Sequence, residues 1–439
     1  MRKKNLLTAI DIGTEKIALL TAQLDPTVTD QLQVVGVSVI PSQGIKKSQI
    51  VDLEKVIASL TQALDAAERM AGSNISSAFV SIAGAQIDSL NSKGVVAVAS
   101  PKQEIMSDDV TRVIEAARAV SIPPGKEILH IIPRDFAVDS QHGIKDPTGM
   151  TGIRLESEAH IVTATSTSLK NLSKCLNDVG IIVDGFVFSG LAAAKSSLTE
   201  TEKELGVALV DIGAGTTSVT VYVESSLAAS FTLPVGARHI TQDIALGCRL
   251  SLEAAEKVKT ELSNHPPETV VPQAGESKEG LKKRREKENE LNLKTLGIDE
   301  GVETLTKKTI IEGIMVPRMK EIFTLLVKEL RERKLLNEIP AGTVLTGGGA
   351  ETVAITEIAK RTLNLPSRIG RPISLKGVTH DLNGPEFSTV VGTLLYGQEQ
   401  GTHLNTTGGF KLPELNFKLK LNLGGITSQI QKFIKSLLP

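Results

Sequence analysis

The polar and apolar residues of this chain alternate in short blocks with two different periods. Residues 51–70 carry apolar side chains at helical spacing, among them Val56 and Leu60, and Gly72 follows as a helix-ending residue. Shorter apolar blocks, such as Ala78–Ala83, are typical of strands. Because blocks of the two kinds follow one another along most of the chain, the sequence predicts a layered α/β fold.

One pattern occurs twice, near the start of the chain and again near its middle. The first copy is Thr8-Ala-Ile-Asp11-Ile-Gly13-Thr14-Glu-Lys16, and the second is Val207-Ala-Leu-Val-Asp211-Ile-Gly213-Ala-Gly215-Thr216-Thr217. Each copy predicts a β-hairpin whose turn contains Asp-x-Gly and hydroxyl side chains. Glycine lets backbone N–H groups approach a phosphate, and an aspartate at the strand end can hold the accompanying Mg²⁺ through water. A single copy is typical of an ordinary hairpin, but two copies facing each other predict a clamp for a nucleoside triphosphate.

A glycine run forms a third candidate element. The segment Thr343-Val-Leu-Thr346 predicts a strand, Gly347, Gly348 and Gly349 follow it, and the spacing of Val353–Leu363 is helical. Glycines between a strand and a helix let backbone amides approach a ligand. Their consecutive order fits neither the dinucleotide fingerprint nor a P-loop. A turn required only for packing explains this segment equally well.

With these motifs, the chain resembles the actin-like ATPases and, among them, the FtsA family of bacterial cell-division proteins. The resemblance covers about residues 6–400. Four further segments are closer to FtsA than to actins in general: Glu204-Leu-Gly206, Ile240-Thr-Gln-Asp243-Ile-Ala245, Ala255-Glu256-Lys-Val-Lys259 and Pro385-Glu-Phe-Ser-Thr-Val-Val-Gly392-Thr-Leu-Leu-Tyr-Gly397. The resemblance implies an actin-like (ribonuclease H-like) two-domain ATPase fold of the α/β class, with an inserted α+β subdomain and a C-terminal amphipathic helix.

The resemblance also implies roles for the motif residues in binding ATP and Mg²⁺. Asp11 and Asp211 would order Mg²⁺ and its waters, and Lys16 would reach the terminal phosphates. Glu256 and Lys259, one helical turn apart, would meet the ribose and adenine, although an exposed salt bridge explains that pair as well. The residues that would cradle the phosphates or form the adenosine motif are Gly13, Thr14, Gly213, Gly215, Thr216, Thr217, Gly347, Gly348 and Gly349.

Domain boundaries follow from the same resemblance. A loop with the sequence Asp139-Ser-Gln-His-Gly-Ile-Lys-Asp146-Pro-Thr-Gly149 resembles one in the FtsA subdomain called 1C, whose helix we expect to begin with a cap near Ser107. His130 and His142 are expected at the surface or in loops of this subdomain. The expected parts are 1–77 and 166–197, closed by 385–400, for the first domain; 78–165 for subdomain 1C; 198–245 and 331–384 for the second domain; and 246–330 for an outer subdomain 2B.

Loop-forming residues and a dense mixed-charge run interrupt subdomain 2B over about 263–300. A solvated, mobile insertion is the favoured interpretation and a partner site the alternative. A helix is expected to resume through Ile310–Leu330.

Composition limits the possible functions. The 439 residues suggest several domains, and a formal net charge of −1 gives no reason to expect nucleic acid as a partner. Cys175 and Cys248 have neither metal spacing nor disulfide density, which favours a reducing cytoplasm. The charged start resembles a signal peptide, but Asp11 and Glu15 interrupt the apolar stretch that should follow. These features predict a cytoplasmic protein without a membrane-spanning segment.

The end of the chain predicts a short amphipathic helix. Residues 415–423 alternate with the period of a strand, and 401–425 together would form a linker. Over 426–439, large apolar residues recur at helical spacing, with Lys432 and Lys435 off that face. Such a terminal helix can dock on its own domain or lie in a membrane interface. Resemblance to the FtsA targeting tail favours the membrane, with contacts from Ile426, Ile430, Phe433, Ile434, Leu437 and Leu438.

Departures from the family pattern bear on catalysis. Ala214 replaces a common glycine, Ser218 stands where an Asp is frequent, and 187–193 offers no Glu or Gln to orient water. The sequence therefore predicts ATP binding with at most slow hydrolysis.

The resemblance implies a peripheral protein on the inner face of the cell membrane. It would self-assemble and tether the FtsZ ring by binding the FtsZ C-terminal tail, and it would meet other division proteins through subdomain 1C. The anionic membrane surface would be a further partner. The alternatives are a PilM-like pilus assembly scaffold and a small-molecule kinase of the same fold.

Overall fold

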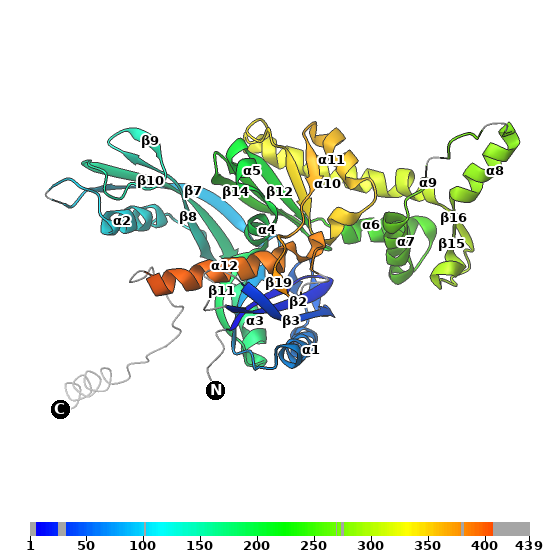
Figure 1. The fold of residues 1–439 in the computed structure, drawn as a ribbon, viewed down its shortest axis with the longest axis horizontal. Coiled ribbons are helices and arrows are strands. Elements are labelled where there is room, and N and C mark those ends of the chain that lie inside the picture. Colours follow the sequence, from blue (N-terminus) through cyan, green and yellow to red (C-terminus); the bar gives the residue numbers. More distant parts are fainter. Residues whose placement is uncertain are drawn as a thin grey trace, which may run out of the picture. The chain divides into compact units, whose positions relative to one another are not determined.

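Each Asp-x-Gly copy forms the central hairpin of a mixed sheet, and the two sheets repeat the same strand order (Figure 1). The first sheet has the order β11-β6-β1-β2-β3-β19, and the second has the order β18-β17-β12-β13-β14. In both, the hairpin has an antiparallel neighbour on one side (β3 or β14) and two parallel strands on the other. The two predicted β-hairpins are therefore confirmed, and each lies inside a sheet.

The computed structural model describes residues 6–24, 32–100, 102–268, 270–273, 276–378 and 382–406. The chain divides into two units, Met1–Gln398 and Glu399–Pro439. The strands of the first sheet are β1 (Leu6–Ile12), β2 (Lys16–Leu24), β3 (Leu32–Pro41), β6 (Ser77–Ile82), β11 (Ile182–Phe188) and β19 (Lys376–Gly377). Those of the second are β12 (Val207–Ile212), β13 (Thr217–Val223), β14 (Ser226–Leu233), β17 (Thr343–Thr346) and β18 (Ser367–Ile369).

The predicted helix at 51–70 is α1 (Leu53–Ala71), which covers the first sheet. Asp52 caps its start by accepting a hydrogen bond from the Lys55 backbone N–H at 3.2 Å. Gly72, with φ +62°, ends it by donating its N–H to the Glu68 carbonyl. The apolar face contributes Val56 and Leu60 to the core beneath the sheet. The other helices of this half are α3 (Ser166–Asp178) and α4 (Ser189–Ser197), whereas α5 (Glu200–Leu205) packs against β13 of the second sheet.

Four helices pack with the second sheet around one large core. They are α6 (Ala237–Cys248), α7 (Leu252–Asn264), α10 (Val316–Glu332) and α11 (Ile355–Leu363). The helix expected through 310–330 is present, but it begins with α9 (Lys307–Ile310) and a π-helical turn, Ile311–Met315, before α10 continues. The 3₁₀ turns are Leu293–Leu296, Gly348–Glu351 and Pro385–Phe387.

The last described helix, α12 (Ser388–Thr406), returns to the first half of the fold. Val390, Val391 and Leu394 join the core formed by β1, β2 and β3. A Cβ added to Gly392 would lie 1.7 Å from the Ala192 carbonyl of α4, so only glycine permits this approach of the two helices.

The insertion is a separate four-stranded sheet of order β7-β10-β8-β9, with α2 (Ser107–Arg118) on it (Figure 1). Its strands are β7 (Asp88–Ala97), β8 (Lys126–Val138), β9 (Gln141–Ile144) and β10 (Arg154–Thr165). The expected start of this subdomain at 78 is wrong, because β6 pairs with β1 and β11 in the first sheet. The cap expected near Ser107 is Met106, whose backbone N–H donates to the Asp109 carboxylate at 3.0 Å.

The prediction for His130 is wrong, because this residue is buried on β8. Its Nε2 accepts the backbone N–H of Phe188 at 3.0 Å, and burial lowers its pKa to about 4. His142 is exposed, as expected. Cys175 is buried, and Cys248 is half-buried.

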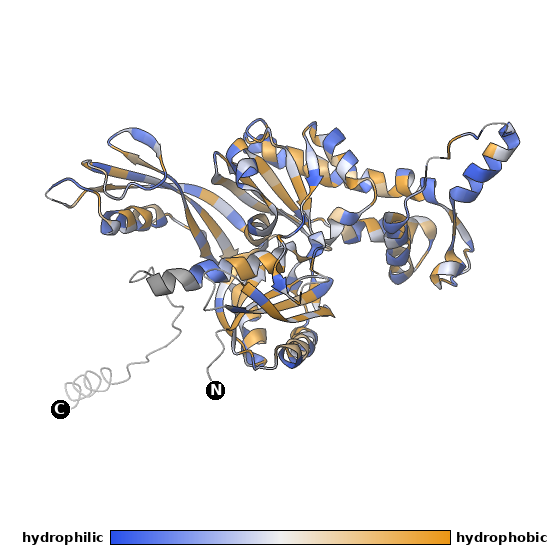
Figure 2. Cartoon of the chain, in the orientation of Figure 1, coloured by the Kyte–Doolittle hydropathy of each residue, from blue (hydrophilic) through white to orange (hydrophobic). Residues whose placement is uncertain are grey.

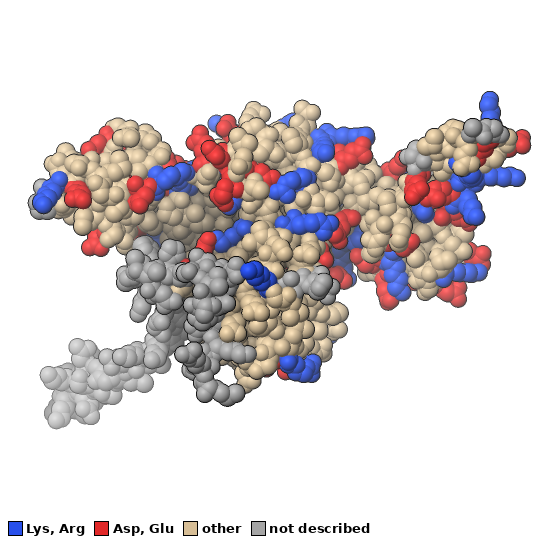
Figure 3. All heavy atoms as spheres, in the orientation of Figure 1, with Lys and Arg blue, Asp and Glu red and all other residues tan. Residues whose placement is uncertain are grey.

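The charged part of 263–300 forms α8 (Lys278–Glu288), which has no buried residue. Ser277 caps it, accepting from the Gly280 N–H at 3.0 Å. Figure 2 shows α8 as almost entirely hydrophilic, in contrast to the apolar strands of the two main sheets. Figure 3 shows acidic and basic side chains intermixed over most of the face drawn. The small strands β4 (Ile45–Lys46), β5 (Gln49–Ile50), β15 (Glu290–Asn292) and β16 (Thr304–Thr306) complete the fold.

The alternating segment 415–423, most of the 401–425 linker and the terminal helix at 426–439 lie outside the described residues. Among the residues that are described, no helix is long and apolar enough to cross a bilayer.

Candidate functional site

The two Asp-x-Gly turns have the same hydrogen-bonded geometry. Gly13 N–H donates to the Lys16 carbonyl, and Gly213 N–H donates to the Thr216 carbonyl, both at 2.9 Å. Each aspartate occupies the next-to-last position of its strand, Asp11 opposite Ala18 and Asp211 opposite Ser218. The sequence repeat is therefore a structural repeat.

A small hairpin, β4–β5, brings the two turns together. At its tip, Ser48 donates its backbone N–H to Thr14 Oγ1 at 3.1 Å, and its hydroxyl lies 3.0 Å from Thr216 Oγ1. A Cβ added to Gly215 would lie 2.8 Å from the Lys47 Cα and 2.9 Å from Thr14 Oγ1. Glycine at 215 is thus required for the two halves to meet here.

Asp11 and Asp211 lie in this junction, and both have raised pKa values. Burial raises the pKa of Asp211 to about 7, and the nearby charge of Asp11 adds to that rise. Burial also raises the pKa of Asp11, against the hydrogen bond from the Ser81 hydroxyl and the charge of Lys16, which lower it. The Thr389 hydroxyl donates to Asp211 Oδ2 at 3.1 Å. Two half-buried carboxylates that both resist ionisation favour a bound cation.

Lys16 extends from the first turn into the same region. Its ammonium lies 3.9 Å from the centroid of the Phe387 ring, a cation–π geometry. Burial lowers the pKa of Lys16, whereas the charges of Glu386, Asp11, Glu351 and Asp211 raise it. Four carboxylates thus act on one ammonium group.

These residues fit a hydrated Mg²⁺ ion better than a metal held only by protein. No group of three or more His, Cys, Asp or Glu within the described ranges is arranged to hold a metal directly. Mg²⁺ usually takes one or two carboxylates and completes its shell with water and phosphate oxygens. Asp11 and Asp211, with their raised pKa values, are the residues that would hold it.

The glycine run after β17 is explained largely by packing. A Cβ on Gly347, which has φ +80°, would lie 2.4 Å from Asp211 Oδ1, and one on Gly349 would lie 2.4 Å from the Ile212 side chain. Gly348 has room, its nearest contact being Glu386 Cβ at 3.6 Å. The run therefore seats β17 against the end of β12, and Gly348 is its member most open to a ligand.

Thr217 differs from the role predicted for it. Its side chain is fully buried, and its hydroxyl donates to the Val235 carbonyl at 2.8 Å. It stabilises the second sheet and does not face the site. Ser218, next to it, accepts a hydrogen bond from the Ser189 hydroxyl at 2.9 Å.

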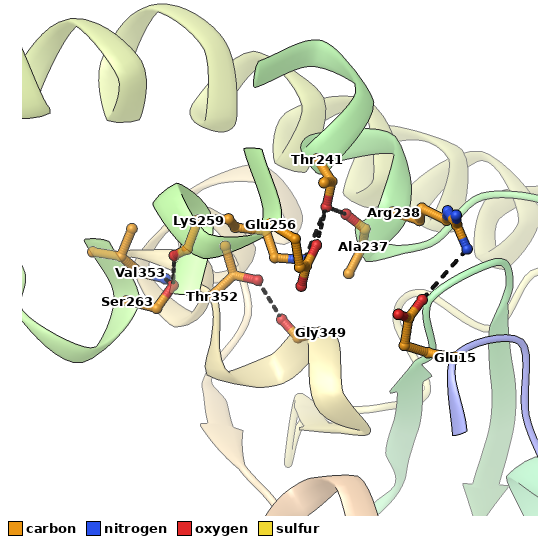
Figure 4. A network of polar contacts seen from close by, with 10 residues as sticks. All are labelled: Glu15, Ala237, Arg238, Thr241, Glu256, Lys259, Ser263, Gly349, Thr352 and Val353. Atoms are coloured by element: carbon orange, nitrogen blue, oxygen red, sulfur yellow. Dashed lines mark hydrogen bonds and ion pairs between the residues drawn. The ribbon is translucent and has the colours of Figure 1, made fainter. Parts of the chain in front are cut away.

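Glu256 and Lys259 lie on α7, as their spacing predicts, and form an ion pair of 2.7 Å. Figure 4 shows both converging on Thr241 of α6, whose hydroxyl donates to Glu256 at 2.5 Å and accepts from Lys259 at 3.0 Å. Ser263 on the same helix accepts the Val353 N–H at 3.2 Å and so ties α7 to the segment after the glycine run. Thr241, Glu256 and Lys259 therefore form a connected polar group between α6 and α7.

A contact that the sequence did not indicate joins the two halves nearby (Figure 4). Arg238, at the start of α6, pairs with Glu15 of the first turn at 3.4 Å, and the Arg238 N–H donates to the Ala214 carbonyl of the second turn at 2.9 Å. Ser48 and Thr389 were also missed. Ser48 lies in no motif, Thr389 was noted only within a segment that resembles FtsA, and tertiary pairing brings both to the site.

Two family models match the chain. The model "Cell division protein FtsA" matches residues 208–392, and "SHS2 domain inserted in FTSA" matches residues 84–163. The second match begins after β6, in agreement with the sheet to which β6 belongs.

Curated relatives match over nearly their full length. The chain is 37% identical to the cell division protein FtsA of Pseudomonas aeruginosa, over 92% of each chain. It is 36% identical to that of Borreliella burgdorferi, over 90% of this chain and 92% of the relative.

Solved structures share the fold at low identity. The PilM–PilN type IV pilus biogenesis complex superposes with a TM-score of 0.60 at 15% identity, covering 89% of this chain and 98% of that one. MreB5 of Spiroplasma citri bound to AMPPNP superposes with a TM-score of 0.52 at 14% identity, covering 92% and 99%. The same protein has also been solved bound to ADP. The fold is thus the predicted actin-like fold, and on sequence the chain belongs to the FtsA family of cell-division proteins.

Proposed function

We propose that this FtsA-family protein binds ATP with Mg²⁺ between its two Asp-x-Gly turns. The observation that carries the proposal is the meeting, at one junction, of two turns with the same hydrogen bond, each with an aspartate of raised pKa. The nucleotide-bound structures of MreB5, which has the same fold, support it.

Each group in the junction has a role that suits its chemistry. Asp11 and Asp211 would hold Mg²⁺ through water, and the ion would neutralise phosphate charge. The turns of Gly13–Thr14 and Gly213–Thr216 would offer backbone N–H groups to phosphate oxygens, with Lys16 as a movable cation. Glu256 and Lys259, joined through Thr241, would meet the ribose and adenine.

Hydrolysis would be slow. The polar partners of the two aspartates are hydroxyls, Ser81 and Thr389, and the start of α4 supplies Ser189 paired with Ser218. A hydroxyl neither takes up the proton of an attacking water as a carboxylate does nor fixes it as firmly as a carboxamide. The geometry therefore supports a nucleotide-dependent structural role better than rapid turnover.

We infer a role in tethering FtsZ to the membrane from the sequence of the tail together with the family. The terminal segment 426–439 would place an amphipathic helix in an anionic membrane on the inner face of the cell. Its six large apolar residues would yield roughly 9–18 kcal/mol at most, against roughly 1 kcal/mol or more for ordering each residue. One tail would then bind reversibly, and self-assembly would multiply tails on one membrane. The assembled protein would hold FtsZ there through the FtsZ C-terminal tail, while subdomain 1C meets other division proteins.

The pilus-scaffold and kinase alternatives gain no support. Similarity to the PilM structure is 15% in sequence and concerns the fold alone. The kinase alternative would need an acidic base beside a substrate hydroxyl. The two half-buried aspartates are assigned to the cation, which leaves Glu351 and Glu386, the other carboxylates that act on Lys16, as candidates for that base.

Calorimetry of ATP binding in excess Mg²⁺ tests the proposal. We expect Asp11→Asn to weaken binding by at least about tenfold, since one charge–charge contact with the hydrated ion is lost. Asp65→Asn, on the exposed side of α1, is the matched control and should bind as the unaltered protein does. Equal affinity in Asp11→Asn and Asp65→Asn would overturn the proposed site.

A further inference from the structure

A cavity lies where the inserted sheet meets the second main sheet. It has a volume of about 200 Å³ and is lined by none of the nucleotide-site residues. Residues of β8, α4 and the β13–β14 hairpin form its walls. Those used in the argument are the apolar Ile132, Phe136, Leu191 and Leu227 and the basic Arg134 and Lys145.

Hydrogen bonds across this seam fix the cavity's shape. The turn between β13 and β14 consists of Glu224 and Ser225, both at positive φ, +51° and +61°. This conformation presents the Glu224 carbonyl to Lys145, whose ammonium donates to it at 3.1 Å and to Ser226 Oγ at 3.0 Å. The Ser226 hydroxyl in turn donates to the Arg134 carbonyl at 2.7 Å. The cavity is therefore a built feature with defined polar edges.

Its two cations have one carboxylate between them. Arg134 pairs through its terminal nitrogen with Glu158 at 2.6 Å, while its Nε is buried without a hydrogen-bond partner. Lys145 is exposed and forms no ion pair within the described part of the chain; its partners are the neutral oxygens of Glu224 and Ser226. A buried donor without a partner is unfavourable by about 1–3 kcal/mol in typical proteins. The cavity thus holds an excess positive charge beside an unsatisfied donor.

The positive charge of Arg134 also acts on a neighbouring histidine. His160 of β10 has a pKa lowered to about 3, first by burial and then by the positive charge of Arg134. The two ring nitrogens of His160 lie 2.6 Å from the Asn91 side-chain oxygen and 3.0 Å from the Ser230 hydroxyl, so the ring has a fixed position between the inserted sheet and β14.

We propose that this cavity binds a carboxylate that carries one apolar group. The carboxylate would accept hydrogen bonds from Lys145 Nζ and from Arg134 Nε, which has no hydrogen-bond partner, and the apolar group would lie against Ile132, Phe136 and Leu191. The volume is below the roughly 300 Å³ at which sites for drug-sized ligands begin, so the ligand is small. A free organic acid and the C-terminal residue of a peptide present the same chemistry. Either would link the inserted sheet to β14 and favour one placement of subdomain 1C.

Saturation-transfer NMR on the full-length protein, with 3-phenylpropionate as the probe, tests this assignment. For a ligand of this size we expect a Kd on the order of a millimolar. The neutral analogue 3-phenylpropanamide should bind at least about fivefold more weakly, because it lacks the charge. The peptide acetyl-Ala-Ala-Phe, with a free carboxylate, identifies the source: competition indicates a chain end, and failure to compete indicates a free acid.

Lys145→Gln locates the site. This residue is exposed, so the variant should unfold within about a degree of the unaltered protein, and it should bind 3-phenylpropionate at least about fivefold more weakly. Lys93→Gln, an exposed lysine on β7 of the same sheet that does not line the cavity, should change nothing. Equal binding of acid and amide, an unaltered Kd in Lys145→Gln, or no saturation transfer at 20 mM probe would each overturn the proposal.

Discussion

Replacing Asp211 by Asn should stabilise the nucleotide-free protein while removing its affinity for Mg-ATP. The Asp211 carboxyl has a pKa of about 7 in the folded chain, against an ordinary value of 3.8. Three pKa units correspond to about 4 kcal/mol of unfavourable free energy for the ionised group, an upper limit. Asparagine has the same shape, keeps an oxygen for the Thr389 hydroxyl and carries no charge. At about 2.1 cal/mol/K per residue, the 439 residues have an unfolding entropy near 0.9 kcal/mol/K. The melting temperature should therefore rise by up to about 4 °C at pH 8.

The pH dependence gives a second readout with a fixed sign. Because the folded pKa of Asp211 lies above the unfolded value, the folded state binds more protons between about pH 4 and pH 7. Stability of the unaltered protein should thus increase as the pH falls from 8 toward 5, and this gain should be smaller in Asp211→Asn. Scanning calorimetry without nucleotide measures both effects, with Asp65→Asn as the control. A lower melting temperature for Asp211→Asn at pH 8, or an unchanged affinity for Mg-ATP, would refute the reasoning.

Three other predictions concern different parts of the molecule. Glu15→Arg should speed dissociation of a fluorescent ATP analogue by about two- to fivefold, since a half-exposed pair contributes up to about 1 kcal/mol, and Arg238→Glu in the same chain should restore the rate; stopped-flow traces identical in all three proteins would contradict it. Gly347→Ala should reduce stability by more than the roughly 1 kcal/mol of Gly143→Ala, which has nearly the same positive φ but open space around it, and thermal unfolding compares the two. Deleting 426–439, or Phe433→Glu, should abolish sedimentation with anionic vesicles and leave ATP binding intact. The control variant Gln431→Ala should still sediment with the vesicles. A much lower melting temperature of the truncated chain would instead indicate a docked helix.

The two hairpins and their aspartates were predictable because local signals specify them. The Asp-x-Gly turns need glycine for a hydrogen bond between residues three apart, and apolar strands on both sides of the turn set the register. Both requirements are written in consecutive residues. The helix at 51–70 was predictable for the same reason, since Asp52 and Gly72 supply its two ends locally.

Errors arose where the partner of a residue decides its role. His130 stands among apolar residues of β8, and nothing nearby in sequence indicates that the Phe188 N–H would meet it. Thr217 follows the turn as a phosphate-binding hydroxyl would, yet its hydroxyl donates to the carbonyl of Val235, two residues beyond β14. The predicted start of subdomain 1C at residue 78 was wrong for the same reason, because the sequence of an apolar strand does not indicate the sheet in which it pairs.

Residues that join the two halves at the site carried no signal at all. Ser48 occupies a left-handed turn, φ +59°, that Asn or Gly usually forms, and its importance lies wholly in contacts with Thr14 and Thr216. Arg238 is one of many exposed basic residues until α6 places it opposite Glu15. Such contacts depend on two separate sheets being folded and adjacent.

The distribution of these contacts implies which side of the junction yields. On the side of α4, Ala193 and Ala194 pack fully buried with Val207 and Leu209 of the second half. At the proposed nucleotide site, the links are polar: Ser48 with Thr216, Glu15 with Arg238, and Thr389 with Asp211. Apolar burial is worth about 25 cal/mol per Å², whereas an exposed ion pair adds at most about 1 kcal/mol. Separation of the halves should therefore begin at the nucleotide site and pivot near α4. A nucleotide that contacts both turns would then add most of the free energy that keeps the site closed, which couples its presence to the relative placement of the two sheets.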